Sequence, residues 1–178
     1  MENQFRVEDF APRLGTQMQI PSQFSNITWY GLGPVENYID RKDSEIVDVH
    51  SMPIEEFVYD YVEPQENANR IDVRWIAMLD KDSKGLVAVG VEPLSVSAWP
   101  YSFEKLMKSE HINELRPFDD FITLNLDLIQ MGIGGGGCGA IPREDMIPNE
   151  ISYKYGFYLR PYSPKSGKLE AFARTKLE

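Results

Sequence analysis

Period-two alternation of apolar and polar side chains is the feature that most restricts how this chain can fold. The segments 70–79 and 122–131 both alternate in this way over about ten residues. The apolar positions are Ile71, Val73, Trp75, Ala77 and Leu79 in the first segment, and Ile122, Leu124, Leu126 and Leu128 in the second. Residues two apart share a face only in an extended strand. Both segments therefore predict β-strands, the second with the polar residues Thr123, Asn125 and Asp127 on its other face.

Three further segments have the same character. The segment GLVAVGVEPLSVSAW (85–99) predicts two short strands, divided at Glu92–Pro93 because proline has no N–H to donate to a sheet. Aromatic and polar residues alternate in SYKYGFYLRPY (152–162), which predicts another strand. After a turn over 164–167, KLEAFARTK (168–176) is expected to close the sheet.

Helices are scarce in this pattern. The segment 102–115 is the best candidate, with Ser102 as its N-cap and with Phe103, Leu106 and Met107 on one face. One helical turn is expected after Pro53. Because no helix separates each strand from the next, the pattern disfavours a parallel βαβ sheet. We expect a single all-β domain over residues 1–178, with antiparallel sheets packed face to face and one or two short helices.

Charge and cysteine content narrow the class of protein. The 178 residues carry a net charge of −10, which disfavours binding to nucleic acid, since phosphates are held mainly by Lys and Arg. The single cysteine, Cys138, cannot form an internal disulfide, which fits a cytosolic protein and is compatible with a periplasmic one. No apolar run has the length of a membrane span, and the first fifteen residues lack a signal peptide pattern. Those residues are typical of an interior strand, so we expect the chain to begin inside a longer polypeptide.

The segment QMGIGGGGCGAIP (130–142) contains a literal G-x-G-x-x-G at Gly132, Gly134 and Gly137. In a dinucleotide-binding fold such glycines open a helix that holds the pyrophosphate. Here two prolines follow at 142 and 148, with no helical period between them, and no Gly-Lys-Ser/Thr is present. The segment is therefore interpreted as a loop and not as a phosphate site.

Two polar segments, 29–41 and 63–70, carry the side chains best suited to a site. The candidates are Glu36, Asp40, Arg41, Glu66, Asn67 and Arg70, together with Trp75 on the following strand. Glu36 and Asp40 are candidates for paired carboxylates in acid–base chemistry, and the set as a whole is a candidate for binding sugar hydroxyls. The alternative is that these residues brace turns through ion pairs and hydrogen bonds, and bracing is favoured for both segments. His50 and His111 have no cysteine or carboxylate at ligand spacing, so neither a metal site nor a cofactor is expected.

Four segments in order resemble one known family. They are FSNITWYGLGPVENYIDRK, YVEPQENANRIDVRW, LSVSAWPYSFEKLMKSEH and LNLDLIQMGIGG. Together they resemble the C-terminal domain, or small chain, of the bacterial β-galactosidases of glycoside hydrolase family 2. The resemblance implies an antiparallel β super-sandwich similar to galactose mutarotase. It also implies a retaining enzyme that splits terminal β-galactosides with two glutamates.

Both catalytic glutamates of that family lie in a barrel domain that has no counterpart here, so the resemblance implies no catalytic residue in this chain. The expected partners are the upstream domains of a parent enzyme and a galactoside, and a homo-oligomeric parent is left open. After MGIGG, members of the family continue with two acidic or polar residues, a serine and a tryptophan that lies under the sugar. Those last two positions are Cys138 and Gly139 here. The substrate-edge loop implied by the resemblance is Gly134, Gly135, Gly136, Gly137, Cys138 and Gly139.

Two alternatives remain at this point. The first is a stand-alone carbohydrate-binding module, which the aromatic content allows. The second is a mutarotase, which needs a general acid and a general base close together. His50 or His111 with Glu36 or Asp127 would be the pairs to supply them.

Overall fold

The computed structural model describes residues 11–134, 142–148 and 152–175. Seven antiparallel strands form one sheet in this part of the chain. The strands are β1 (Arg13–Pro21), β2 (Asn26–Gly33), β3 (Ile46–Pro53), β4 (Arg70–Leu79), β5 (Gly85–Trp99), β6 (Phe121–Gln130) and β7 (Phe157–Tyr162). The α-helices are α1 (Ile54–Phe57), α2 (Phe103–Lys108) and α3 (Leu169–Arg174), and the 3-10 helices are η2 (Ile112–Leu115), η3 (Glu144–Met146) and η4 (Pro164–Ser166). The prediction of a mostly β, antiparallel domain is confirmed.

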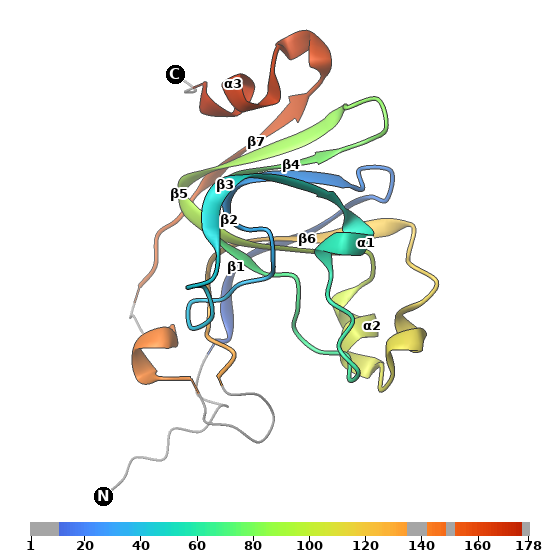
Figure 1. Ribbon diagram of the computed structural model, residues 1–178, viewed down its shortest axis with the longest axis vertical. Coiled ribbons are helices and arrows are strands. Elements are labelled where there is room, and N and C mark those ends of the chain that lie inside the picture. Colours follow the sequence, from blue (N-terminus) through green and yellow to red (C-terminus); the bar gives the residue numbers. More distant parts are fainter. Residues whose placement is uncertain (1–10, 135–141, 149–151, 176–178) are drawn as a thin grey trace, which may run out of the picture.

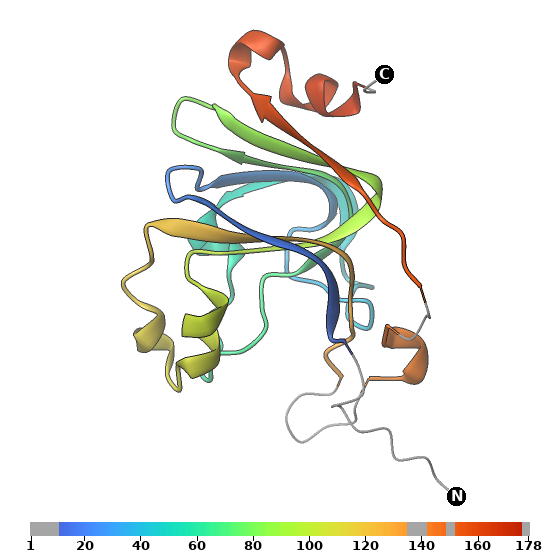
Figure 2. The same ribbon diagram turned by 180° about the vertical axis from the view of Figure 1, so that it is seen from behind.

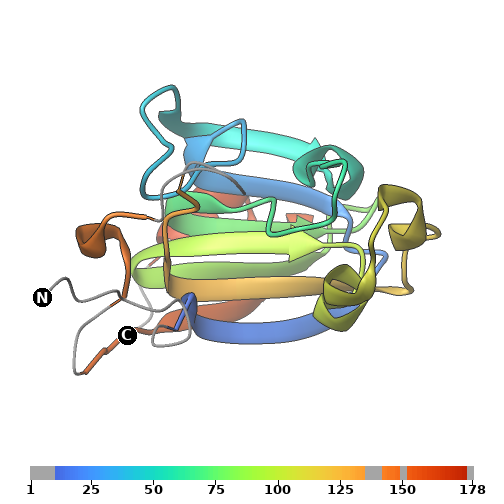
Figure 3. The same ribbon diagram turned by 90° about the horizontal axis from the view of Figure 1, so that it is seen from below.

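The sheet has the order β1-β6-β5-β4-β2-β3, and β7 pairs with the first half of β5. The sheet curves strongly. As a result, β7 and the β4–β5 hairpin stand above β1 and β6 in the views from the front and from behind (Figures 1 and 2). A hydrogen bond of 2.6 Å between the Thr16 and Tyr155 hydroxyls joins β1 to the segment before β7. Viewed from below, the strands run side by side, and α1, α2 and the segment between α1 and β4 lie across them (Figure 3).

The prediction of two short strands over residues 85–99 was wrong, because this segment forms the single strand β5. It is continuous over fifteen residues and pairs with three other strands. Val89 lies opposite Trp75 and Leu94 lies opposite Val73, so residues 90–93 bulge out across from a single residue of β4. Pro93 falls in this bulge, where its missing N–H interrupts no ladder, and the strand bends there without ending.

The main hydrophobic core lies on the inner face of the curved sheet. Ile122, Leu124 and Leu126 of β6 belong to it, as their alternation predicts. Trp29 and Trp99 are fully buried in the same cluster, and helices α1 and α2 contribute Phe57 and Leu106. Each such side chain stabilises the fold by about 1.5–3 kcal/mol through its removal from water.

Strand β4 is buried on both faces. Val73 and Ile76 pack in the main core, whereas Trp75 and Ala77 pack in a second cluster with Val87, Leu79, Tyr162 and Ala173. The prediction that Val73 and Trp75 share a face was therefore wrong. The bulge opposite Arg74 shifts the register between them, and Asp72 has a positive φ of 55°.

The segment 168–176 was predicted as a closing strand, but it contains helix α3. Leu169, Phe172 and Ala173 stand at helical spacing and pack against the second cluster. With α1 and α2 this makes three short α-helices in the described residues, one more than the upper limit predicted. None of the helices described is long and apolar enough to cross a membrane.

The predicted helix at 102–115 is correct at its start and wrong at its length. The Ser102 hydroxyl accepts a hydrogen bond of 3.0 Å from the Lys105 N–H, as expected of an N-cap. Helix α2 ends at Lys108, and η2 follows after a break that includes His111. Leu106 is buried, but Met107 is 67% exposed, so it does not share the buried face.

Candidate functional site

The start of the glycine segment is held at four consecutive amides. Met131 donates to the Pro12 carbonyl at 2.8 Å, and Gly132 donates to the Met146 carbonyl at 3.0 Å. The Asp40 carboxylate accepts from the next two N–H groups, those of Ile133 at 3.1 Å and Gly134 at 2.8 Å. Asp40 therefore fixes the base of the segment that was predicted to form the substrate-edge loop.

Glycine is required at two positions of this base. A Cβ on Gly132 would lie 2.5 Å from a carboxylate oxygen of Asp40, which no real Cβ contact allows. Gly134 has a φ of 66°, in the left-handed region that favours glycine. The other predicted loop residues, Gly135, Gly136, Gly137, Cys138 and Gly139, lie outside the described residues.

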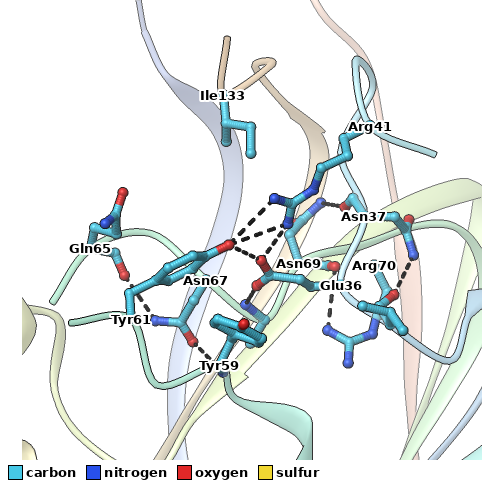
Figure 4. A network of polar contacts seen from close by, with 12 residues as sticks. Glu36, Asn37, Arg41, Tyr59, Tyr61, Gln65, Asn67, Asn69, Arg70 and Ile133 are labelled. Atoms are coloured by element: carbon cyan, nitrogen blue, oxygen red, sulfur yellow. Dashed lines mark hydrogen bonds and ion pairs between the residues drawn. The ribbon is translucent and has the colours of Figure 1, made fainter. Parts of the chain in front are cut away.

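Glu36 is the centre of a buried polar cluster close to this base. Its side chain is 3% exposed and forms an ion pair with Arg41. The same oxygen accepts a short hydrogen bond from the Tyr61 hydroxyl, and the other oxygen accepts from the Ala68 N–H at 2.7 Å. Figure 4 shows Arg41 and Tyr61 meeting at the Glu36 carboxylate, with the Ile133 side chain near Arg41. Three donors therefore satisfy one buried carboxylate.

Asn37 connects the two polar segments that the sequence singled out. Its N–H donates to the Asn69 carbonyl at 2.7 Å, and its side-chain oxygen accepts from the Ile71 N–H at 2.8 Å. The Asn69 amide in turn donates to the Asn37 carbonyl at 2.9 Å. Residues 36–41 and 66–71 thus form one structural unit, although thirty residues separate them in the sequence.

Arg70 and Asn67 bond mainly to the backbone. The Arg70 guanidinium lies 4.1 Å from the Phe57 ring centre and donates to the carbonyls of Pro34, Phe57 and Asn69. Burial lowers the Arg70 pKa to about 10. Asn67 donates to the Gln65 carbonyl at 2.8 Å and to the Tyr101 hydroxyl at 3.2 Å. These contacts correspond to bracing of the loop before β4.

A second ion cluster lies on the polar face of β6. Arg13 donates to Asp127 at 3.0 Å and to the Ser97 hydroxyl at 3.2 Å, and its guanidinium lies 3.5 Å from Glu66. Asp127 is 2% exposed and Glu66 is 26% exposed at the side chain. The Arg13 guanidinium therefore pairs with two carboxylates, so the cluster has one more negative than positive charge when both carboxylates are ionised.

Burial changes the protonation of this cluster. It raises the pKa of Glu66 to about 7, against the opposing effect of Arg13, while Asp127 and Glu36 raise it further. Burial raises the pKa of Asp127 to about 6, again opposed by Arg13. Nearby, burial followed by the charges of Glu66 and Glu36 holds the Tyr38 pKa well above its usual value. The cluster thus binds a proton near neutral pH.

Four buried side-chain polar atoms have no hydrogen-bond partner in the part of the chain that is described. Two of them are the Tyr38 hydroxyl and Glu66 Oε1, and the charge of Glu66 acts on Tyr38. The third is Gln130 Oε1, and Gln130 lies opposite Arg13 in the β1–β6 pairing. The fourth, Trp75 Nε1, lies in the second hydrophobic cluster. A buried polar atom without a hydrogen bond is costly, and Glu66 Oε1 is compensated by its ion pair with Arg13.

Several members of the site were not named from the sequence. Asn37 and Asn69 lie inside the two polar segments. Arg13 comes from β1, whereas Tyr38 and Tyr61 lie inside or next to the segments that were named. A tyrosine gives no sign in the sequence of whether its hydroxyl faces a carboxylate. Arg13 reaches Asp127 only through the β1–β6 pairing, which places Gly15 opposite Asp127.

The nominated mutarotase pairs do not meet in the described residues. The ring centres of His50 and Trp29 are 5.1 Å apart, and His50 Nε2 lies 3.2 Å from the Ile46 carbonyl oxygen. His111 is exposed and precedes η2. Among the residues described, no group of three or more His, Cys, Asp or Glu side chains could hold a metal ion.

Taken together, the described residues form an antiparallel β domain in which the half-buried carboxylate of Asp40 holds the base of a glycine segment. Comparison with known proteins identifies the family to which this domain belongs. The family model described as "Beta galactosidase small chain" matches residues 1–159. The chain belongs to this β-galactosidase small-chain family.

Curated relatives agree with the family. The β-galactosidase of Priestia megaterium is 36% identical over 153 residues, which are 84% of this chain and 15% of that protein. The β-galactosidase of Vibrio cholerae is 36% identical over 124 residues, which are 70% of this chain and 11% of that protein. The chain therefore spans about one seventh of the length of the curated relatives that it matches.

Proposed function

We propose that this chain is the C-terminal accessory domain of a retaining β-galactosidase and that it presents the glycine segment at the edge of the active site. The hydrolysis of terminal β-galactosides would be carried out by glutamates in preceding domains. The observation that carries the proposal is the anchoring of Ile133 and Gly134 by Asp40 within a domain of the small-chain family. A rigid base gives a loop a defined place next to a substrate.

The same proposal extends to the fold and the partners. The curved sheet described here would combine with the preceding part of the parent enzyme into a super-sandwich of the galactose mutarotase type. The coverage of only 15% of the Priestia megaterium protein supports the view that upstream domains are the partners. Cys138 and Gly139 replace the family's serine and tryptophan, so apolar cover for the sugar would come from elsewhere.

A domain exchange tests the assignment. We expect no hydrolysis of a chromogenic β-galactoside by this chain alone. In the Priestia megaterium enzyme, deletion of the matching 153 residues should abolish activity, and replacement by this chain should restore part of it. Steady-state kinetics on purified, folded proteins measures both results. Full activity of the deletion protein would contradict a contribution to the active site, and enzyme-like turnover by this chain alone would contradict catalysis elsewhere.

Asp40→Ala in the exchanged enzyme tests the role of the anchor. Without the carboxylate, two N–H groups lose their acceptor and the glycine segment loses its fixed base. We expect kcat/KM for the galactoside to fall about tenfold, which corresponds to ~1.4 kcal/mol. Asp43→Ala is the matched control, since Asp43 is exposed three residues away. An Asp40→Ala enzyme as active as Asp43→Ala would argue against this role.

A further inference from the structure

A pocket of about 430 Å³ lies on the outer face of the sheet, beside helix α3. Figure 1 shows α3 at the top of the molecule, whereas β6 crosses the middle and the chain that follows it runs away from α3. The pocket is bounded by side chains of β2, β4, β5, β7 and α3. Its volume falls in the range of small-molecule sites, which is about 300–1,000 Å³.

Three arginines line this pocket in a chain whose net charge is −10. Arg74 lies 5.4 Å and Arg174 lies 5.9 Å from the centre of the same ring, that of Tyr30. Arg160 donates to the carbonyls of Phe172 and Thr175 at the end of α3. In the described part of the chain, none of these three arginines forms an ion pair with a carboxylate. Their charge is therefore available to an anion from outside.

The aromatic lining gives the pocket a second property. Tyr30, Trp75 and Tyr158 all line it, and Tyr158 is 45% exposed. Trp75 is 2% exposed, and its Nε1 is the one indole donor without an acceptor in the described residues. The Nε1 atoms of Trp29 and Trp99 donate to the carbonyls of Leu32 and Asn67, both at 3.0 Å. Aromatic faces cover flat rings, so this lining favours a ligand that contains a ring.

We propose that this pocket binds a small ring compound that carries a carboxylate, with the carboxylate at Arg74 and Arg174 and the ring against the exposed Tyr158. Guanidinium groups pair with carboxylates through two parallel hydrogen bonds, and stacking on a tyrosine holds each arginine in place. The site is separate from the Asp40 anchor. It would let a ligand bind to this domain without blocking the edge of a galactoside site.

The test is a titration followed by the indole N–H resonances of the three tryptophans in ¹H–¹⁵N spectra of this chain. The probes are glucuronate and benzoate, with glucose and benzyl alcohol as neutral counterparts. We expect the Trp75 resonance to shift and those of Trp29 and Trp99 to stay, with a Kd in the millimolar range or below. Arg74→Gln and Arg174→Gln should each weaken binding about tenfold. Arg143→Gln, which changes an exposed arginine paired with Asp145, should leave it unchanged.

The unshifted Trp29 and Trp99 resonances show that each variant is folded. Binding of glucuronate alone would identify an acidic sugar as the ligand class, and binding of benzoate alone would identify an aromatic acid. Three results would overturn the proposal: no Trp75 shift with either acid up to about 20 mM, equal binding of the neutral compounds, or an equal loss in Arg143→Gln.

Discussion

Glu36→Ala should destabilise the domain by about 3–5 kcal/mol, a large part of the stability of a chain this size. The substitution leaves the Tyr61 hydroxyl and the Ala68 N–H without their acceptor, and it removes the partner of Arg41. Ala68 is fully buried and has a φ of 66°, which is a strained backbone conformation. In the variant, the hydrogen bond that helps to hold this conformation is lost. Urea unfolding followed by tryptophan fluorescence measures the effect, because all three tryptophans are buried.

Two variants distinguish the loss of the Glu36 hydrogen bonds from a general loss of negative charge. Glu55→Ala removes an exposed carboxylate from the first turn of α1 and should cost no more than ~0.5 kcal/mol. Tyr61→Phe removes one of the three donors and should cost about 1 kcal/mol. If Glu36→Ala lowers stability no more than Glu55→Ala does, then Glu36 does not hold the two loops together.

Much of the fold follows from the sequence because alternation is a local signal. Segment 122–131 predicts β6 and the core positions of Ile122, Leu124 and Leu126 correctly, although Leu128 is not in the core. Ser102 predicts the start of α2. The failures have a different origin. The bend of β5 at Pro93 and the shift at Val73 depend on which strands lie opposite, and this is set by pairing across the sheet. In 168–176 the helical spacing of Leu169, Phe172 and Ala173 competes with an alternating pattern, and packing against the second cluster decides in favour of the helix.

The site could be predicted by residue type but not by partner. Glu36 and Arg41, named together in one short segment, do form an ion pair. Asp40 lies in the same segment but bonds to the backbone of the glycine segment, more than ninety residues away. Arg13 meets Glu66 and Asp127 only after the sheet has formed. No pattern along the chain encodes such contacts, since each depends on the register between distant strands.

The Arg13 cluster makes the stability of the domain depend on pH in a defined direction. The pKa of Glu66 is raised from an ordinary value of 4.5 to about 7, and that of Asp127 from 3.8 to about 6. The folded state therefore holds protons that the unfolded state has released. The stabilisation is fully present below the unfolded values and is lost as the pH rises through the folded values. Between pH 5 and pH 8 this domain should become less stable.

Glu66→Gln should remove about half of this dependence, because glutamine is neutral at every pH in the window while Asp127 keeps its own raised pKa. At pH 8 we expect the variant to be more stable than the unaltered chain by about 2 kcal/mol, and at pH 5 nearly equal to it. The value is below the full effect of the pKa shift because a quarter of the Glu66 side chain is exposed. Urea midpoints at pH 5, 6, 7 and 8 provide the measurement, with Glu63→Gln, exposed in the same loop, as the matched control. A pH profile that Glu66→Gln leaves as steep as Glu63→Gln does would show that Glu66 is not the group that holds the proton.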